Sequence, residues 1–155
     1  MSYQTDRLVI RPATAEDVPA IVAMLADDTL GARRETPHDI APYLAAFERI
    51  AANPHTLLAY AETADGKPAG TLQLMFLQGL GRHGATRAQI ESVRIHSSMR
   101  GTGLGTELMK WAIETARDRG AFLVQLTSDG SRTEAHRFYE RLGFVHSHAG
   151  YKMQL

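Results

Sequence analysis

Residues 100–105 read Arg100-Gly101-Thr102-Gly103-Leu104-Gly105, and they are the most informative stretch of the chain. An apolar run precedes it, and a helical pattern of apolar residues follows it and ends at Gly120. Glycines that alternate between a strand and a helix expose successive backbone N–H groups, and the helix N-terminus adds partial positive charge. The stretch is therefore predicted to bind an anion, unless it is only a turn that requires positive φ.

Two other nucleotide-binding motifs do not fit this stretch. A dinucleotide fingerprint that starts at Gly101 requires glycine at position 106, where the chain has Thr106. The P-loop pattern G-x-x-x-x-G-K-[ST] is absent from the sequence. The frame that fits is R-x-x-G-x-G, from Arg100 to Gly105.

Composition narrows the class of protein. The chain has 155 residues, with 17 Lys and Arg against 17 Asp and Glu, and no cysteine. This length predicts a single domain, residues 1–155, and a net charge of zero argues against a nucleic-acid partner. No apolar run approaches the roughly 20 residues of a membrane span, and Asp6 and Arg7 interrupt any signal peptide. We therefore expect a cytoplasmic protein without a disulfide, a cysteine-bound metal or a thiol nucleophile.

Hydrophobic periodicity predicts the elements on both sides of the glycine stretch. Before it we expect a strand at 7–11, a helix at 18–25 capped by Thr14 and Asp17, a helix at 40–50, a hairpin of strands 55–62 and 70–77, and a strand at 87–96. After it we expect a strand at 122–126, a helix that starts with a Ser131–Glu134 capping box, and short strands around Val145 and Met153. This order indicates an α+β fold with a mixed sheet in a three-layer α/β/α arrangement.

Three further segments, together with the glycine stretch, resemble the GCN5-related N-acetyltransferases (GNAT) in sequence and in order. They are Ile10-Arg11-Pro12-Ala13 with Glu16-Asp17, Ile90-Glu91-Ser92-Val93-Arg94-Ile95, and Phe138-Tyr139-Glu140-Arg141-Leu142-Gly143-Phe144. The resemblance covers nearly the whole chain. It implies a twisted, mostly antiparallel mixed sheet whose central strands splay apart to hold acetyl-CoA.

The same resemblance implies where acetyl-CoA binds. Its pyrophosphate would rest on the backbone of Gly101, Thr102, Gly103, Leu104, Gly105 and Thr106, with added charge from Arg100. Its pantetheine would pair like an extra strand with Val93, Arg94 and Ile95, and a backbone N–H near Val93 would polarise the thioester carbonyl.

Arg132 departs from the pattern of the family. Many members carry asparagine there and use it to contact pantetheine, so Arg132 is expected to reach a phosphate of the cofactor instead. The run Ala135-His136-Arg137-Phe138-Tyr139 is weakly similar to the aminoalkylphosphonate N-acetyltransferases within the family.

Acetylation of an alkylamine requires a base, because an amine with a pKa near 10.4 is almost fully protonated at pH 7. Glu91 is the candidate base, and strand alternation would place it on the same face as Val93. The alternatives are a surface carboxylate or an ion pair with an arginine such as Arg87.

The leaving thiolate requires a proton or a hydrogen bond. The resemblance makes Tyr139 the donor, and the alternative is a core tyrosine that packs with Phe138 and Phe144. Without cysteine or a G-x-S-x-G elbow, direct transfer in a ternary complex is favoured over an acyl-enzyme. His146 and His148 have the spacing of a metal pair on a strand, but they lack a third ligand nearby, so no metal is expected.

The sequence and the resemblance together predict acetyl-CoA-dependent N-acetylation of a primary amine on a small molecule. Two alternatives stay open: a protein N-terminal or lysine acetyltransferase, and a non-catalytic acyl-CoA-binding domain. We expect a small-molecule amine as partner, no nucleic acid and no membrane, and the resemblance implies a possible homodimer.

Overall fold

The computed structural model describes residues 2–155, which form one six-stranded sheet with the strands side by side in chain order. The strands are β1 (Tyr3–Gln4), β2 (Leu8–Pro12), β3 (Thr56–Thr63), β4 (Pro68–Gln78), β5 (Thr86–Ile95) and β6 (Leu123–Leu126). Each neighbouring pair is antiparallel except β5 and β6, which are parallel. The predicted mixed, mostly antiparallel sheet is confirmed.

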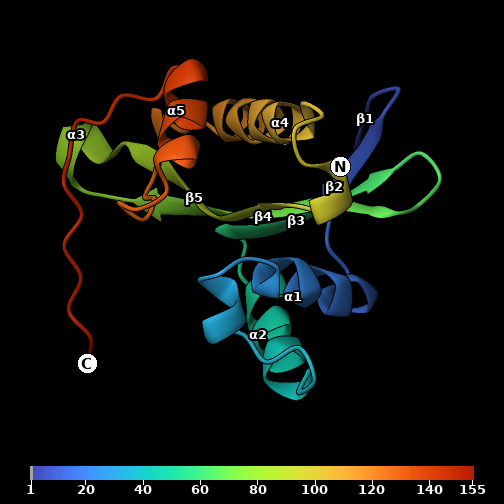
Figure 1. Cartoon of the computed structure of the whole chain (residues 1–155). Coiled ribbons are helices and arrows are strands. Elements are labelled where there is room, and N and C mark those ends of the chain that lie inside the picture. The colour runs from blue at the N-terminus through green and yellow to red at the C-terminus, as the bar shows by residue number, and fades with distance from the viewer. Residues whose placement is uncertain (1) are drawn as a thin grey trace.

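Helices cover both faces of this sheet, which confirms the three-layer arrangement (Figure 1). The helices are α1 (Val18–Ala26), α2 (Ala41–Ala51), α3 (Gly81–Gly84), α4 (Leu104–Asp118) and α5 (Thr133–Arg141). Figure 1 shows α4 and α5 on one face, with α1 and α2 on the other. Short 3-10 turns lie at Ala15–Asp17, Gly31–Arg33 and Ser97–Met99.

The main core lies between α4 and the sheet. Leu72 and Leu74 of β4 are fully buried, as are Leu108 and Met109 of α4. Burial of each such side chain stabilises the fold by about 1.5–3 kcal/mol. Because α4 is held in this way, the glycine stretch at its N-terminus has a fixed position beside the end of β5.

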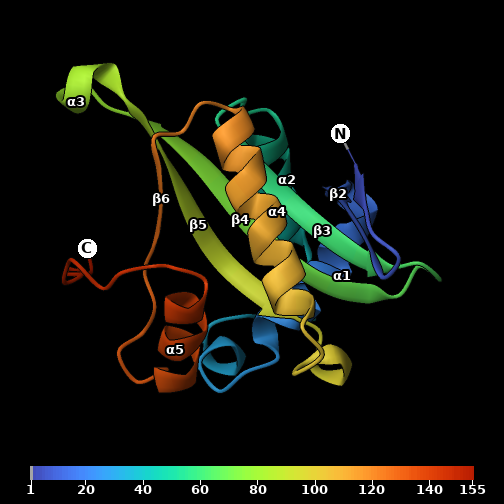
Figure 2. The ribbon, with the colours of Figure 1, turned by 90° about the horizontal axis from the view of Figure 1, so that it is seen from above.

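The two strands β5 and β6 separate partway along their length. Their parallel pairing runs from Arg87 opposite Leu123 to Ile90 opposite Leu126, where β6 ends. The rest of β5, residues 91–95, is paired with β4 but not with β6. Figure 2 shows β5 diverging from β6 and the segment after it, away from the end at which the two strands pair. The splayed central strands expected from the resemblance are therefore present.

A β-bulge at Ser92 changes which face the residues of β5 occupy. Between the pairs Thr71–Arg94 and Gln73–Glu91, the single residue Leu72 of β4 lies opposite two residues of β5, Ser92 and Val93, and Ser92 has φ +56°. As a result Val93 packs with Ile90 on the core beneath α4. The expectation that Glu91 and Val93 share a face is wrong, because the extra residue reverses the alternation between them.

The expected C-terminal strands around Val145 and Met153 are also absent from the structure. Residues 145–155 have no regular structure and are exposed, and Figure 1 shows them running away from the sheet. Exposed apolar groups such as Tyr151 and Met153 have no neighbouring strand to supply hydrogen bonds or burial.

Of the two expected capping boxes, only the first forms. Asp17 accepts hydrogen bonds from the backbone N–H of Thr14 (2.7 Å) and from its hydroxyl (3.1 Å). The Ser131 hydroxyl instead donates to Asp129 (2.6 Å), and Arg132 stands at the N-cap of α5.

The glycine-rich loop before β5 closes into the single turn α3, where Arg82 and His83 adopt left-handed conformations.

Candidate active site

The glycine stretch forms an open row of backbone donors. Gly101 and Gly103 have φ of +77° and +87°, conformations that L side chains rarely adopt. Thr106 and Glu107 donate their N–H groups to the carbonyl of Gly103, whereas the N–H groups of residues 101–105 have no partner in the turn. These five donors at the N-terminus of α4 suit the pyrophosphate of a nucleotide cofactor.

Two arginines flank this row, and both are held by protein groups. Arg100 donates to the backbone carbonyl of Asp27 (2.8 Å) and pairs with its carboxylate (3.2 Å). Arg7 donates to the carbonyl of Thr102 (2.8 Å) and pairs with Glu107 (3.0 Å). Arg100 therefore ties the stretch to the end of α1, and Arg7 ties it to the strand region before β2.

The free edge of β5 leads toward this row. Val93, Arg94 and Ile95 lie on the part of β5 that has no strand neighbour on the β6 side. Side chains take the place of a strand at two carbonyls there: that of Val93 accepts from Arg94 Nη1 (2.9 Å) and that of Ile95 from Arg100 Nε (3.3 Å). An extended ligand can add to such an edge as a strand does. The strand ends at Ile95, whose side chain lies beside Gly105: a Cβ built there would be 3.6 Å from Ile95 Cγ1.

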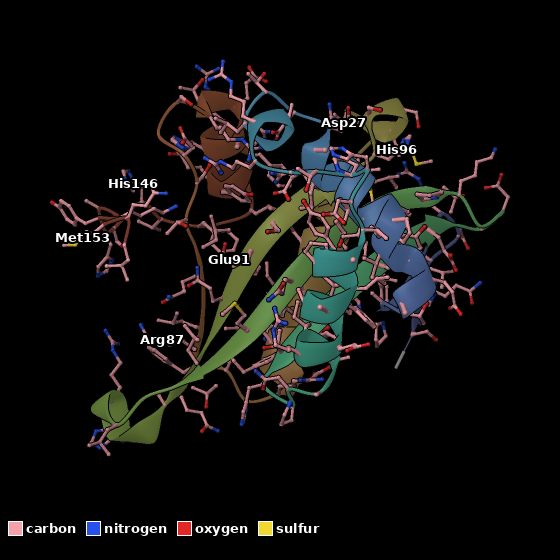
Figure 3. The ribbon with its side chains drawn as sticks, turned by 90° about the horizontal axis from the view of Figure 1, so that it is seen from below. Asp27, Arg87, Glu91, His96, His146 and Met153 are labelled. Carbon is pink, nitrogen blue, oxygen red and sulfur yellow. The ribbon has the colours of Figure 1, made fainter. Side chains whose placement is uncertain are left out.

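Glu91 lies about midway along β5 and is half-buried, with Arg87 nearer the start of the strand (Figure 3). Its carboxylate accepts a hydrogen bond from Gln89 Nε2 (2.9 Å). Gln89 in turn accepts from Gln125 Nε2 (2.6 Å), and Gln125 accepts from Arg87 (3.5 Å). The expected alternative, an ion pair between Glu91 and Arg87, is not formed, since this ladder of two amides separates them.

Tyr139 combines a packing contact with an accessible hydroxyl. Its ring packs against Phe138 and Phe144, with centroids 5.3 and 6.0 Å apart. Burial raises the pKa of Tyr139, and the charges of Arg132 and Arg94 oppose that rise. The phenol therefore stays protonated at neutral pH and can donate a hydrogen bond.

Arg94 and Asp28 lie on the opposite side of β5 from the main core. Arg94 donates to the carbonyl of Val93 (2.9 Å), and its second terminal nitrogen is 3.4 Å from Asp28 Oδ2. Burial lowers the pKa of Arg94, and the charge of Arg132 lowers it further. Burial alone would raise the pKa of Asp28, but the N–H of Gly31 and the charges of Arg94 and Arg132 outweigh it and lower this pKa.

A pocket of about 100 Å³ opens on the same side of the sheet. Its walls are apolar residues of α1 and α2, and its floor includes Thr71, Gln73 and Ser92. Gln73 is the cross-strand partner of Glu91, and Thr71 is the partner of Arg94. Because paired residues on neighbouring strands share a face, Glu91 and Arg94 both project toward the side on which this pocket lies.

Comparison with known proteins identifies the family. The sequence profile of the Acetyltransferase (GNAT) family matches residues 19–144. The chain belongs to the GNAT family. It is 30% identical over 139 residues to the aminoalkylphosphonate N-acetyltransferase of Salmonella typhimurium, which covers 90% of this chain and 86% of that protein.

Two further relatives extend the comparison. The L-methionine sulfoximine/L-methionine sulfone acetyltransferase of Pseudomonas aeruginosa is 28% identical over 149 residues, covering 87% of this chain and 78% of that protein. The crystal structure of a transcriptional regulator from Bacillus halodurans is 44% identical, with a TM-score of 0.91 over 96% of this chain and 99% of that one. The sheet and helices described above are therefore the GNAT fold.

In this GNAT chain the structure brings together most of the residues expected from the sequence. Glu91, residues 93–95 and the glycine stretch all lie along β5 and its continuation, and Tyr139 lies close enough to Arg94 and Arg132 for their charges to affect its pKa. The charge of Arg132 acts on Asp28 and Arg94.

Several contributing side chains were not identified from the sequence. Gln89 stands two residues before Glu91, so strand alternation could have placed it beside that carboxylate. Gln125 and Arg7 carried no local signal, because Gln125 contacts Gln89 from 36 residues away and Arg7 contacts Glu107 from 100 residues away.

His146 and His148 lie on the exposed C-terminal segment and not on a strand, and Figure 3 shows His146 out on that segment. Across residues 2–155, no three His, Asp or Glu side chains gather closely enough to hold a metal ion. Within the same residues, every helix is too short or too polar to cross a bilayer.

Proposed function

We propose that this chain transfers the acetyl group of acetyl-CoA to a primary amine of a small molecule, by direct attack in a ternary complex. The observation that carries the proposal is the free edge of β5. It bears Glu91 and Arg94 on one side and leads at its end to the five unpartnered N–H groups of the glycine stretch.

Acetyl-CoA supplies a thioester that an uncharged amine can attack. The N–H groups of residues 101–105 bind its pyrophosphate, and the exposed backbone of Val93 and Ile95 orients its extended arm. A backbone N–H near Val93 stabilises the oxyanion that forms on the thioester carbonyl.

The proton moves from the ammonium group of the acceptor to Glu91, directly or through water. Because Gln89 donates to the Glu91 carboxylate, one oxygen is held in place while the carboxylate keeps lone pairs for the incoming proton. Attack of the amine on the thioester carbonyl forms the C–N bond, and the C–S bond then breaks. Tyr139 donates a hydrogen bond to the departing thiolate, which takes up the second proton that the nitrogen loses as the amide forms. No side chain needs to carry the acetyl group, in keeping with a chain that has no cysteine.

The similarity to acetyltransferases of aminoalkylphosphonates and of methionine sulfoximine supports a small acceptor. So does the size of the apolar pocket, about 100 Å³, which suits a short side chain better than a peptide. One relative is described as a transcriptional regulator, but the zero net charge of this chain does not favour contact with DNA phosphates.

A panel of amines assayed for release of free CoA tests this function. The panel should include aminoalkylphosphonates, amino acids, polyamines, aminoglycosides and a lysine-containing peptide. We expect turnover with at least one small amine and none with the peptide. Turnover with the peptide alone would show a protein acetyltransferase, and acetyl-CoA binding without turnover of any amine would favour a non-catalytic domain.

A further inference from the structure

A buried arginine beside the proposed active site has one hydrogen-bond donor to spare. The Arg94 side chain is only 16% exposed. Its Nη1 donates to the carbonyl of Val93, and its Nη2 lies 3.4 Å from Asp28, a long contact for an ion pair. Its Nε is buried and has no hydrogen-bond partner among residues 2–155. A buried, charged donor without a partner is costly, so a site of this kind is expected to be completed by a ligand.

A second guanidinium, that of Arg132, acts on the first through its charge. Arg132 is the N-cap residue of α5 and is half-buried, and its charge acts on Arg94, Asp28 and Tyr139. The carboxylate of Asp28 is already shared between Arg94 and the N–H of Gly31. A second carboxylate in range of Arg94, Glu35, accepts from the Tyr43 hydroxyl (2.9 Å). Asp28 and Glu35 therefore each have a hydrogen-bond donor other than the two arginines.

Strand register relates Arg94 to Glu91. The cross-strand partners of Glu91 and Arg94 are Gln73 and Thr71, which are two residues apart on β4 and line the same pocket. Two residues of a strand span about 7 Å. Glu91 and Arg94 thus project to the same side of the sheet from points about 7 Å apart, a separation that a molecule with an amine and an acid a few bonds apart can bridge.

We propose that Arg94 and Arg132 bind an acidic group of the acceptor, a phosphonate or carboxylate, and so hold its amine at Glu91. This proposal rests on the proposed acetyltransferase function and adds the class of amine that the site prefers. Guanidinium groups bind such oxyanions through paired, charge-assisted hydrogen bonds. The other source of the same chemistry is a phosphate of CoA, so the experiment must separate acceptor from cofactor.

The test compares 2-aminoethylphosphonate with a neutral amine of similar length, 3-aminopropanamide. The variants are Arg132→Gln and Arg94→Lys, the second of which keeps a charge for Asp28 but removes Nε. Arg137→Gln is the matched control, because Arg137 is an exposed arginine on the same helix. Steady-state kinetics give kcat/KM for each amine and KM for acetyl-CoA, and calorimetry at saturating CoA gives the affinity for 2-aminoethylphosphonate.

The wild type is expected to prefer the phosphonate by tenfold or more. For the phosphonate, each active-site variant should lose about tenfold to a hundredfold in kcat/KM and in affinity, because it lacks a charge-assisted hydrogen bond. For each variant the loss on the phosphonate should exceed the loss on the neutral amine and the change in KM for acetyl-CoA by at least tenfold, and the Arg137→Gln control should change less than threefold in all three. Equal turnover of both amines, or equal losses on both with a raised KM for acetyl-CoA, would overturn the proposal while leaving the acetyltransferase function intact. Failure to acetylate any amine would refute the acetyltransferase function instead. In that case, absence of phosphonate binding at saturating CoA would separately contradict the arginine site.

Discussion

Replacement of Glu91 by glutamine separates catalysis from structure at the proposed base. Among residues 2–155, the one hydrogen bond to the Glu91 carboxylate comes from Gln89 Nε2, and the amide oxygen of glutamine can accept the same bond. The structural cost is the difference between a charged and a neutral acceptor, about 1 kcal/mol. In a protein of this length that amounts to a fall of about 2–4 °C in the thermal midpoint.

The expected catalytic loss is much larger. General-base catalysis contributes about 10²- to 10⁴-fold, which equals roughly 2.7–5.5 kcal/mol of transition-state stabilisation. Without Glu91 the reaction must wait for amine that is already unprotonated, about one molecule in a few thousand at pH 7 for a pKa near 10.4. Because that fraction rises tenfold per pH unit, kcat/KM of Glu91→Gln should rise by about the same factor per unit from pH 6 to 9.

The assay is release of free CoA over this pH range, with the thermal midpoint measured on the same preparations. Gln89→Met is the control, since it leaves the Glu91 charge in place and removes only its hydrogen-bond donor. We expect the control to lose less activity and to keep the shallower pH profile of the wild type. A Glu91→Gln enzyme within threefold of wild type at pH 7, with a parallel profile, would refute the role of Glu91 as base.

Three further predictions concern other parts of the molecule. Tyr139→Phe should lower kcat by roughly 10- to 10³-fold with little change in acetyl-CoA affinity, whereas normal turnover would leave Tyr139 a packing residue. Gly103→Ala and Gly120→Ala place a Cβ at φ of +87° and +74° without a close contact, so both should lose about 1–2 kcal/mol of stability. Only the Gly103 variant should lose acetyl-CoA affinity by calorimetry, and equal binding by both would contradict the phosphate cradle. Burial would raise the pKa of Asp17, but hydrogen bonds from Arg11 and Thr14 lower this pKa below its usual value. The stability that the charged Asp17 carboxylate contributes should therefore be lost as the pH falls below about 4. Arg11→Met should lower the free energy of unfolding by about 3–5 kcal/mol at pH 7 and flatten the fall of the thermal midpoint in acid. An unchanged fall in acid would exclude the Arg11–Asp17 pair as the source of this pH dependence.

The sequence was informative where local patterns determine structure. Alternation and helical spacing located β3, β4, β5 and α4, because their apolar residues face a single core. The glycine stretch was recognisable because positive φ at Gly101 and Gly103 leaves a signature in residue type.

The sequence was uninformative where one residue or a distant partner decides the geometry. The bulge at Ser92 occurs at an ordinary serine, so alternation wrongly placed Glu91 and Val93 on one face. The C-terminal segment has strand-like apolar residues, but a strand also needs a neighbour, and the pattern cannot show whether one is available. The side chain of Arg94 was overlooked because only its backbone had an expected role, and its burial depends on Asp28.

A single turnover with a labelled acetyl group shows whether the acetyl passes directly from CoA to the amine. The protein, in excess over acetyl-CoA labelled in its acetyl group, is mixed with an accepting amine, quenched and analysed by mass spectrometry. Direct transfer predicts label on the amine nitrogen in the same amount as free CoA, with no label on the protein at any time and none released when the amine is omitted. Label that first accumulates on the protein, or that leaves as acetate while the amine stays unmodified, would contradict the account.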